Sequence, residues 1–294
     1  MKYTVNDFHE QFKTDAECLD FIFKTRFPDG GKCGCGKVDC FYPVTGRRCY
    51  ACSWCGRQIS PTAGTIFHKS ETSLKLWFFA IFLMSSSKNG VAAMELKRQL
   101  GVTYKTAWRM AHQIRKLMDV SGGKLSGVVE VDETYIGGLS KNMHIKKRAE
   151  KEIKTGPHSK TAVLGLVQRE GEVRAKVIEE TATWSLVPQV MDHVHQGSTV
   201  CTDEWKGYNL VGRVGYVHAR VNHRDKEYVR AIAHTNTIEG FWSQLKRSIN
   251  GTFHHVSKKH LQNYVNEFCY RYNRRKSEQP LFSDLSVRVG EQRA

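Results

Sequence analysis

The sequence predicts an α/β unit of about 160 residues, preceded by a small cysteine-rich module and a helical segment. Three observations carry this prediction. Cysteine and glycine crowd residues 32–57, apolar residues at helical spacing follow up to residue 118, and strand-like and helical stretches then alternate. A chain of 294 residues with 40% hydrophobic residues is long enough for two or three domains, so we expect separate modules.

The N-terminal half is predicted to be helical outside the cysteine module. Apolar residues at helical spacing predict a helix from Asp15 to Phe27, which Pro28 and the following glycines end. Three more helices are expected after the module, at 74–84, 91–100 and 103–118. The predicted domains are an N-terminal helical segment (1–30), the metal module (31–60), a helical region (70–120) and the α/β domain (125–294).

The pattern changes after a glycine-containing linker at residues 121–123. Residues with high strand preference then alternate with turn residues. Strands are expected at Val128–Tyr135, Thr161–Gln168, Val173–Glu179, Ser198–Thr202 and Gly215–Val221. Helices are expected at Thr183–Val194, Thr237–Ile249 and Lys258–Arg274.

The charge balance indicates a polyanionic partner. Lys and Arg number 45 against 29 Asp and Glu, which gives a net charge of +16 and favours nucleic acid as the partner. Because the chain has neither an apolar run of about 18 residues nor a secretion signal, we expect no membrane contact and a cytoplasmic, nucleoid-associated protein. In that reducing compartment, the nine cysteines favour metal binding over disulfides.

The cysteine module predicts a structural zinc site. Cys52 and Cys55 are three positions apart and are followed by a glycine, which suits two thiolates that bind one ion from a tight turn. The expected other half is Cys33 and Cys35, whose spacing is tighter than usual. Cys40 and Cys49 lie nearby, and Cys35 with Cys40 is the alternative first pair. A closed four-cysteine site leaves no open position for catalysis.

The segment from Val91 to Met110 has the form of a helix-turn-helix. A helix rich in small residues ends at Gly101, and the next helix opens with Thr103, Tyr104 and Lys105, whose side chains can reach bases and phosphates. An ordinary helical hairpin with solvated basic residues would give the same pattern.

Carboxylates follow apolar stretches at three places. Asp132 lies in the strand Val128–Tyr135, Asp203 follows a second strand, and Glu239 lies near the start of a helix that carries Lys246 two turns later. Groups from two strands and a helix can converge on two Mg²⁺ or Mn²⁺ ions for in-line phosphoryl transfer. Asn236 and Glu239 also have the spacing of a capping box, which would make Glu239 a poorer ligand.

Two other acidic residues on the same strand compete with Asp132 as the expected metal ligand. Strand alternation puts Glu130 on the same face as Asp132 and Glu133 on the opposite face. Composition and spacing do not decide among the three.

The chain resembles the zinc-ribbon DDE transposases of insertion sequences, in particular the ISXO-like group. The matching stretches are Cys52–Ser60, Thr62–Phe67, Val131–Gly138, Thr202–Tyr208 and His234–Arg247. The resemblance implies a ribonuclease H-like catalytic domain with Asp132, Asp203 and Glu239 as the metal-binding triad. It also implies that Lys246 touches DNA near the scissile phosphate. The third catalytic position is sometimes Asn in this group, so Asn236 is a rival or helper to Glu239.

The function that follows is binding of an insertion sequence's terminal inverted repeats, strand cleavage, and transfer to target DNA. The expected partners are double-stranded DNA of the transposon ends and the target, and further copies of this chain in a homo-oligomer. The expected cofactors are structural Zn²⁺ and catalytic Mg²⁺ or Mn²⁺. The alternative is a DNA-binding regulator with the same zinc ribbon and helix-turn-helix, whose α/β domain is not catalytic.

Overall fold

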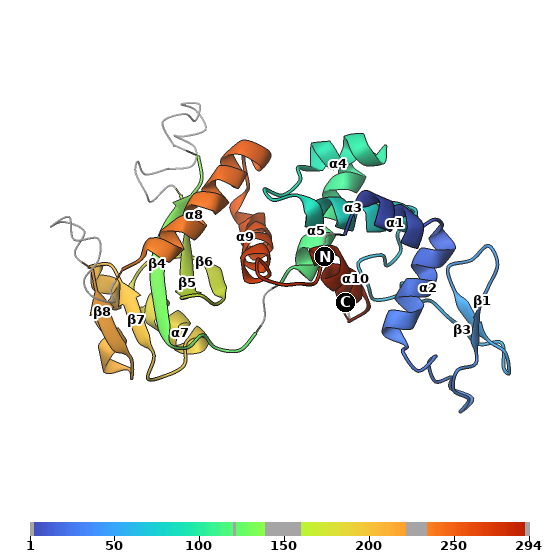
Figure 1. Ribbon diagram of the computed structural model, residues 1–294, viewed down its shortest axis with the longest axis horizontal. Helices are drawn as coiled ribbons and strands as arrows, with labels where there is room; N and C mark the ends of the chain where they lie inside the picture. The colour runs from blue at the N-terminus through green and yellow to red at the C-terminus, as the bar shows by residue number, and fades with distance from the viewer. Residues whose placement is uncertain (1–2, 120–121, 139–159, 222–233, 292–294) are drawn as a thin grey trace. The chain divides into compact units, whose positions relative to one another are not determined.

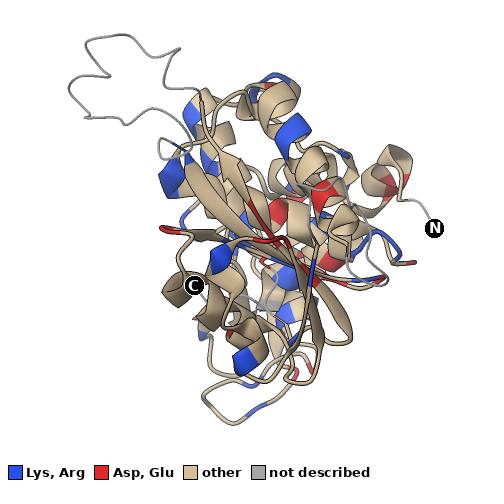
Figure 2. Ribbon diagram, turned by 90° about the vertical axis from the view of Figure 1, so that its left-hand side faces the viewer, with Lys and Arg blue, Asp and Glu red and all other residues tan. Residues whose placement is uncertain are grey.

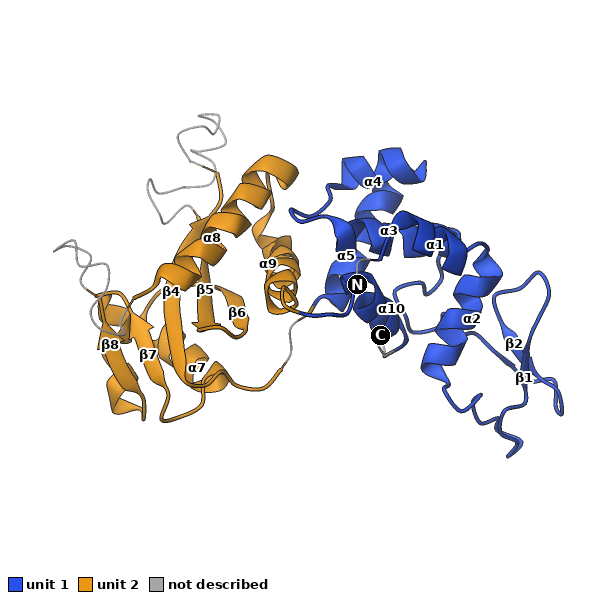
Figure 3. Ribbon diagram, viewed as in Figure 1, with its two compact units in different colours: residues 1–118, 277–294 blue, residues 119–276 orange. Residues whose placement is uncertain are grey.

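The computed structural model describes residues 3–119, 122–138, 160–221 and 234–291 (Figure 1). The chain divides into two compact units (Figure 3). Unit 1 holds residues 1–118 and 277–294, and unit 2 holds residues 119–276. The predicted linker begins at Ser121, which lies outside the described residues. None of the described helices is long and apolar enough to cross a bilayer.

The cysteine module of unit 1 folds as three short antiparallel strands. They are β1 (Phe41–Pro43), β2 (Tyr50–Cys52) and β3 (Gln58–Ile59), in the order β1-β2-β3. Phe23 stacks on Tyr50 with ring centroids 4.0 Å apart, which fixes this small sheet against the helix α2 (Asp15–Arg26).

The helices of unit 1 enclose an aromatic core. Phe8, Phe12, Phe78 and Phe282 are buried and lie in ring contact with one another. The helices are α1 (Val5–Gln11), α2 (Asp15–Arg26), α3 (Leu74–Ser86), α4 (Ala93–Leu100), α5 (Tyr104–Leu117) and α10 (Leu281–Glu291).

Helix α10 belongs to a different unit than the predicted domain limits imply. It packs on α2, α3 and α5 because Phe282, Leu285 and Val289 are buried in the core of unit 1. The predicted α/β domain of 125–294 therefore includes a C-terminal segment that belongs to unit 1. The four helices predicted in the N-terminal half are present, with ends displaced by at most a few residues.

Unit 2 is a mixed α/β fold on a five-stranded sheet, consistent with a ribonuclease H-like domain. The strand order is β6-β5-β4-β7-β8. Strand β4 lies in the middle, antiparallel to β5 and parallel to β7. The strands are β4 (Val128–Ile136), β5 (Thr161–Gln168), β6 (Val173–Ile178), β7 (Thr199–Thr202) and β8 (Val217–Arg220).

Helices cover both faces of this sheet. On one face, α7 (Thr183–His193) buries Leu186 and Val190 against apolar residues of β4, β5 and β7. On the other face, α8 (Asn236–Ser248) and α9 (Lys258–Asn273) bury a second apolar cluster, which includes Trp242 and Phe268. Helix α8 continues directly into a π-helical turn, η6 (Ile249–Phe253). The central strands thus contact apolar residues on both faces of the sheet, which is an unusual environment for their acidic residues.

Candidate active site and cysteine cluster

Three of the predicted site residues come from adjacent elements of unit 2. Asp132 lies on the central strand β4, Asp203 directly follows β7, and Glu239 lies in the first turn of α8. Strands β4 and β7 are parallel neighbours with Glu130 opposite Cys201, so Asp132 on β4 lies beside the point where the chain leaves β7 at Asp203. In Figure 2, red segments mark Asp and Glu on the strands, and blue segments mark Lys and Arg, several of them on helices.

Asp132 is held in a partly buried position near the other two carboxylates. The Trp242 indole N–H donates a hydrogen bond of 3.0 Å to Asp132 Oδ2. Burial and the nearby charge of Asp203 raise the pKa of Asp132 to about 6, and Glu239 adds to this rise. Asp203 and Glu239 thus lie near enough to Asp132 to disfavour its ionisation, and a cation at this place would stabilise the charged form of Asp132.

A glycine on the neighbouring strand makes the Trp242 contact possible. Gly165 pairs with Asp132 in the β4–β5 register. A Cβ atom at position 165 would lie 2.4 Å from Trp242 Cζ2, closer than any real contact, so the indole ring occupies the space that a side chain would fill. Sequence analysis did not identify this role, although a glycine inside an apolar strand is a known mark of a close approach.

Asp203 is fixed by the turn that follows β7. Its Oδ1 accepts a hydrogen bond of 2.9 Å from the Trp205 N–H, and the Thr202 hydroxyl donates to the Asp203 carbonyl oxygen at 2.7 Å. This local side-chain to backbone bond is typical of Asp in turns. It orients the carboxylate without using its second oxygen.

Glu130 caps helix α8 from the sheet. Its side chain is fully buried, and its Oε2 accepts hydrogen bonds from the backbone N–H groups of Thr237 at 2.9 Å and Ile238 at 3.1 Å. Arg169 Nε donates to Oε1 at 2.8 Å, and His234 Nδ1 lies 3.1 Å from the same oxygen. Glu130 shares a face with Asp132 as predicted, but it is engaged in positioning the helix that carries Glu239.

This cap corrects the capping-box alternative for Asn236 and Glu239. The N-cap residue is Thr235, Asn236 is the first residue of α8, and the amides of the next two residues, Thr237 and Ile238, donate to Glu130. Glu239 is exposed, and its Oε1 accepts one hydrogen bond of 3.0 Å from the Thr235 hydroxyl. The physical reason is that a buried carboxylate from β4 satisfies the helix amides, which leaves Glu239 available.

The carboxylates are close enough to influence one another but are not gathered as a compact ligand set. Among the described residues, the groups whose ligand atoms all lie within 4.8 Å of one another consist of four cysteines. A pair of ions 3.5–4 Å apart would need a wider set of oxygens than a single ion does. The donor chemistry, oxygen ligands from two strands and a helix, suits Mg²⁺ or Mn²⁺.

Glu133 lies next to Tyr208, and the charges of Asp132 and Asp203 still act on it. Burial raises its pKa to about 8, and the fully buried Tyr208 lies beside it. Glu133 therefore lies on the opposite face of β4 from Glu130 and Asp132, as strand alternation predicted. Asn236 and Lys246 are both exposed on α8, and Lys246 lines a cavity beside the end of that helix.

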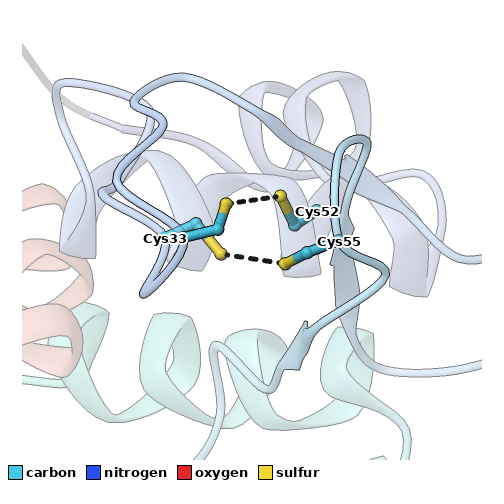
Figure 4. Close-up of side chains that lie close together, drawn as sticks. Cys33, Cys52 and Cys55 are labelled. Carbon is cyan, nitrogen blue, oxygen red and sulfur yellow. Dashed lines mark hydrogen bonds between the residues drawn. The ribbon is translucent and has the colours of Figure 1, made fainter.

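The predicted zinc ligands Cys33, Cys35, Cys52 and Cys55 come together in unit 1 (Figure 4). Their sulfur atoms lie within 4.8 Å of one another, with 3.5 Å between Cys33 and Cys55 and 3.8 Å between Cys35 and Cys52. Tetrahedral zinc with Zn–S bonds of about 2.3 Å requires sulfur atoms about 3.8 Å apart. The cluster could therefore hold one zinc ion.

The protonation of Cys52 also suits a metal. Burial opposes its ionisation, but the N–H groups of Cys55 and Trp54 lower the pKa of the Cys52 thiol to about 6. Thiolates are the metal-binding form. Cys40, part of the alternative first pair, is buried with its sulfur 3.4 Å from that of Cys52 but does not belong to the four-cysteine group. The Cys49 thiol donates to Gln58 Oε1.

Together, the fold and these sites define a mixed α/β protein with an acidic site on the central strand of its sheet and a separate four-cysteine cluster. Residues 124–273, about half of the chain, match the ISXO2-like transposase domain. The protein belongs to this transposase family.

Two curated relatives agree with this assignment. An uncharacterized protein in transposable element ISH50 of Halobacterium salinarum is 27% identical over 230 residues, which cover 76% of this chain and 77% of that protein. An uncharacterized transposase-like protein of Haemophilus influenzae is 26% identical over 102 residues, which cover 35% of this chain and 81% of that protein.

One solved structure also shows a weak likeness. It is a simian T-cell lymphotropic virus intasome in complex with the PP2A regulatory subunit B56 gamma. The match covers 64% of each chain at 12% identity, with a TM-score of 0.30. The likeness is too weak to bear on the fold.

Proposed function

We propose that the protein binds the terminal inverted repeats of an insertion sequence and cleaves and joins DNA strands at the acidic site of unit 2. One observation carries the proposal. Asp132, Asp203 and Glu239, from two parallel strands and a helix, lie close enough that the other two raise the pKa of Asp132. Family membership supports the same conclusion.

In this mechanism, Asp132, Asp203 and Glu239 would hold the divalent ions. When bound, Mg²⁺ or Mn²⁺ supplies an activated water or 3′-hydroxyl and stabilises the leaving oxygen. The chain's own residues keep the ligands in place. Trp242 orients Asp132, the turn after β7 orients Asp203, and Glu130 fixes the first turn of α8 that carries Glu239. Asn236 is one helical turn from Glu239 and is its alternative as the third ligand.

DNA binding is assigned to unit 1 together with the basic residues of unit 2. Helices α4 and α5 meet at Gly101, which adopts the left-handed conformation with φ of 67°. Tyr104 and Trp108 are exposed on α5, and Thr103 caps its first turn through the Thr106 N–H. These features support a helix-turn-helix whose second helix enters the major groove. The four-cysteine cluster of unit 1 would bind structural zinc.

The proposal is tested with a labelled duplex that carries the element's own terminal repeat. We expect cleavage at the repeat end with Mg²⁺ and none with EDTA. Asp203→Asn should abolish cleavage while the duplex is still bound, because binding depends mainly on phosphate contacts. Attack of the released 3′-hydroxyl on a second duplex would distinguish a transposase from a nuclease. Binding without cleavage in any divalent metal would contradict the proposal and favour a DNA-binding regulator.

Transposition also requires that two element ends meet. We therefore expect at least two copies of the chain on the DNA under cleaving conditions. Analytical ultracentrifugation of the complex measures this, and a complex with a single copy that still cleaves would contradict it.

A further inference from the structure

His218 on strand β8 contacts the residue that directly precedes Asp203. Strands β7 and β8 are parallel neighbours, and Thr202 on β7 pairs with Arg220 on β8. His218 Nε2 lies 2.9 Å from the hydroxyl oxygen of Thr202. His218 is thus connected to Asp203 through a single intervening residue.

The donors and acceptors in this chain of hydrogen bonds follow from the chemistry of each group. The Arg220 Nε–H can only donate, and it donates to His218 Nδ1 at 3.4 Å. Nδ1 therefore carries a lone pair, so the proton of the neutral ring is on Nε2 and is donated to the Thr202 oxygen. The Thr202 hydroxyl keeps its own hydrogen for the Asp203 carbonyl oxygen, at 2.7 Å.

The surroundings of His218 favour the neutral ring that this assignment requires. Burial, and in addition the positive charge of Arg220, lower the pKa of His218 to about 4. A protonated ring could not accept from Arg220, because both of its nitrogens would be donors. At neutral pH, His218 therefore accepts at Nδ1 and donates from Nε2.

The bond from His218 determines which acceptor the Thr202 hydroxyl uses. Thr202 is fully buried, and it shares a face of β7 with Val200, which packs in the apolar core under α7. The hydroxyl hydrogen can turn about the Cβ–Oγ1 bond, and the donor at Nε2 directs it towards the Asp203 carbonyl oxygen. With the Trp205 N–H bound to Asp203 Oδ1, the chain at Asp203 is held at two points.

We propose that His218 is a positioning residue for Asp203 and that it acts through the Thr202 hydroxyl. The inference rests on the proposed function, in which Asp203 would hold a divalent ion. It adds strand β8 to the elements that keep the ligands in place. Partners that orient metal ligands typically contribute about 10–100-fold in metal affinity or activity.

The test compares His218→Leu with His218→Gln in the full, zinc-loaded chain near neutral pH. Leucine removes the donor, whereas the side-chain amide of glutamine can donate to the Thr202 oxygen in place of Nε2. Mn²⁺ binding is measured by electron paramagnetic resonance, and the part that is lost in Asp203→Asn defines the acidic site. Exchange of the Trp205 amide, which donates to Asp203, is measured by NMR on samples without Mn²⁺.

We expect His218→Leu to weaken Mn²⁺ binding about tenfold and to speed exchange of the Trp205 amide several-fold. His218→Gln should bind Mn²⁺ within about threefold of wild type. Thr202→Val perturbs the same bond from its other side, and it should weaken Mn²⁺ binding about as much as His218→Leu. The double variant should lose little more than either single variant, because both changes remove one shared interaction.

His193→Leu is the matched control, because His193 is also a half-buried histidine of unit 2 but bonds to a carbonyl of its own helix, that of Gln189. It should bind Mn²⁺ as wild type does.

Three results would overturn this inference alone. They are wild-type Mn²⁺ binding in His218→Leu and Thr202→Val, a loss in His218→Gln or His193→Leu as large as that in His218→Leu, and losses that add in full in the double variant. A wild-type chain that binds no more Mn²⁺ than Asp203→Asn would contradict the proposed function, and this inference with it.

Discussion

Replacement of Glu130 tests how the sheet positions the helix that carries Glu239. Glu130→Ala removes the carboxylate that caps the Thr237 and Ile238 amides and pairs with Arg169. Removing one partner of a buried ion pair costs about 3–5 kcal/mol, and losing a helix N-cap costs about 1 kcal/mol. The two costs share one group and do not simply add. Because the Arg169 side chain is 22% exposed and can reach water, we expect a loss of about 3 kcal/mol.

Glu130→Gln removes the charge of the Glu130 side chain and keeps its shape. The amide keeps one acceptor oxygen but loses the ion pair, so its cost should lie between those of wild type and Glu130→Ala, at about 1–3 kcal/mol. Urea unfolding measures these differences through the midpoint at constant slope. Glu180→Ala serves as the control, because an exposed acid away from such contacts should change stability by less than about 0.5 kcal/mol.

Amide hydrogen exchange localises the effect. In Glu130→Ala, the Thr237 and Ile238 amides should exchange faster than in wild type, because they lose their acceptor. The reasoning is refuted if Glu130→Ala unfolds within about 1 kcal/mol of wild type with unchanged exchange at these two amides. A loss of stability of the expected size with unchanged exchange would mean that the ion pair, and not the cap, is what Glu130 supplies.

Three further predictions follow from contacts in the two units. Gly165→Ala should displace Trp242 from Asp132 and lower cleavage more than DNA binding, as measured with the terminal-repeat duplex, whereas equal losses would contradict this role. Cys52→Ser should lower bound zinc, measured by mass spectrometry of the metal, from one ion per chain to less, and Cys40→Ala should retain it; loss in both would assign Cys40 to the site. Burial lowers the pKa of His218 to about 4, and Arg220 adds to this shift, so the folded state keeps the neutral ring while the unfolded state protonates near 6.5. Stability relative to His218→Gln should therefore fall as pH drops from about 7 to about 4, and a pH-independent difference in urea midpoints would contradict the assignment.

The sequence was sufficient to predict an element or a site wherever a local pattern of residues determines it. Periodicity predicted α3 to α5 and α7 to α9, and alternation predicted all five strands of the sheet, because these elements bury one face or both. The cysteine spacing predicted the cluster in unit 1, since the ligands of a small metal module lie close together in sequence.

What the sequence did not reveal depends on contacts between distant residues. Helix α1 buries only Phe8, so its sequence lacks the repeat of apolar residues from which a helix is predicted. Helix α10 was not predicted, and its membership of unit 1 depends on packing against helices more than about 160 residues earlier in the chain. The role of Glu130 requires a helix terminus 107 residues away, and that of Gly165 requires knowing which indole ring packs on it. Spacing between motifs cannot supply such partners.

The return of the chain to unit 1 through α10 has a practical consequence for dissecting the protein. Unit 2 is inserted between α5 and α10, so both of its ends are joined to unit 1. A single cut anywhere in unit 2 would release no intact unit, and a fragment that stops at residue 118 would lack the helix that completes its aromatic core. A self-sufficient version of unit 1 would need a short loop joining Met118 to Ser277 in place of unit 2. Evolutionary exchange of unit 2 would likewise require two simultaneous junctions, which keeps the two units inherited as one piece.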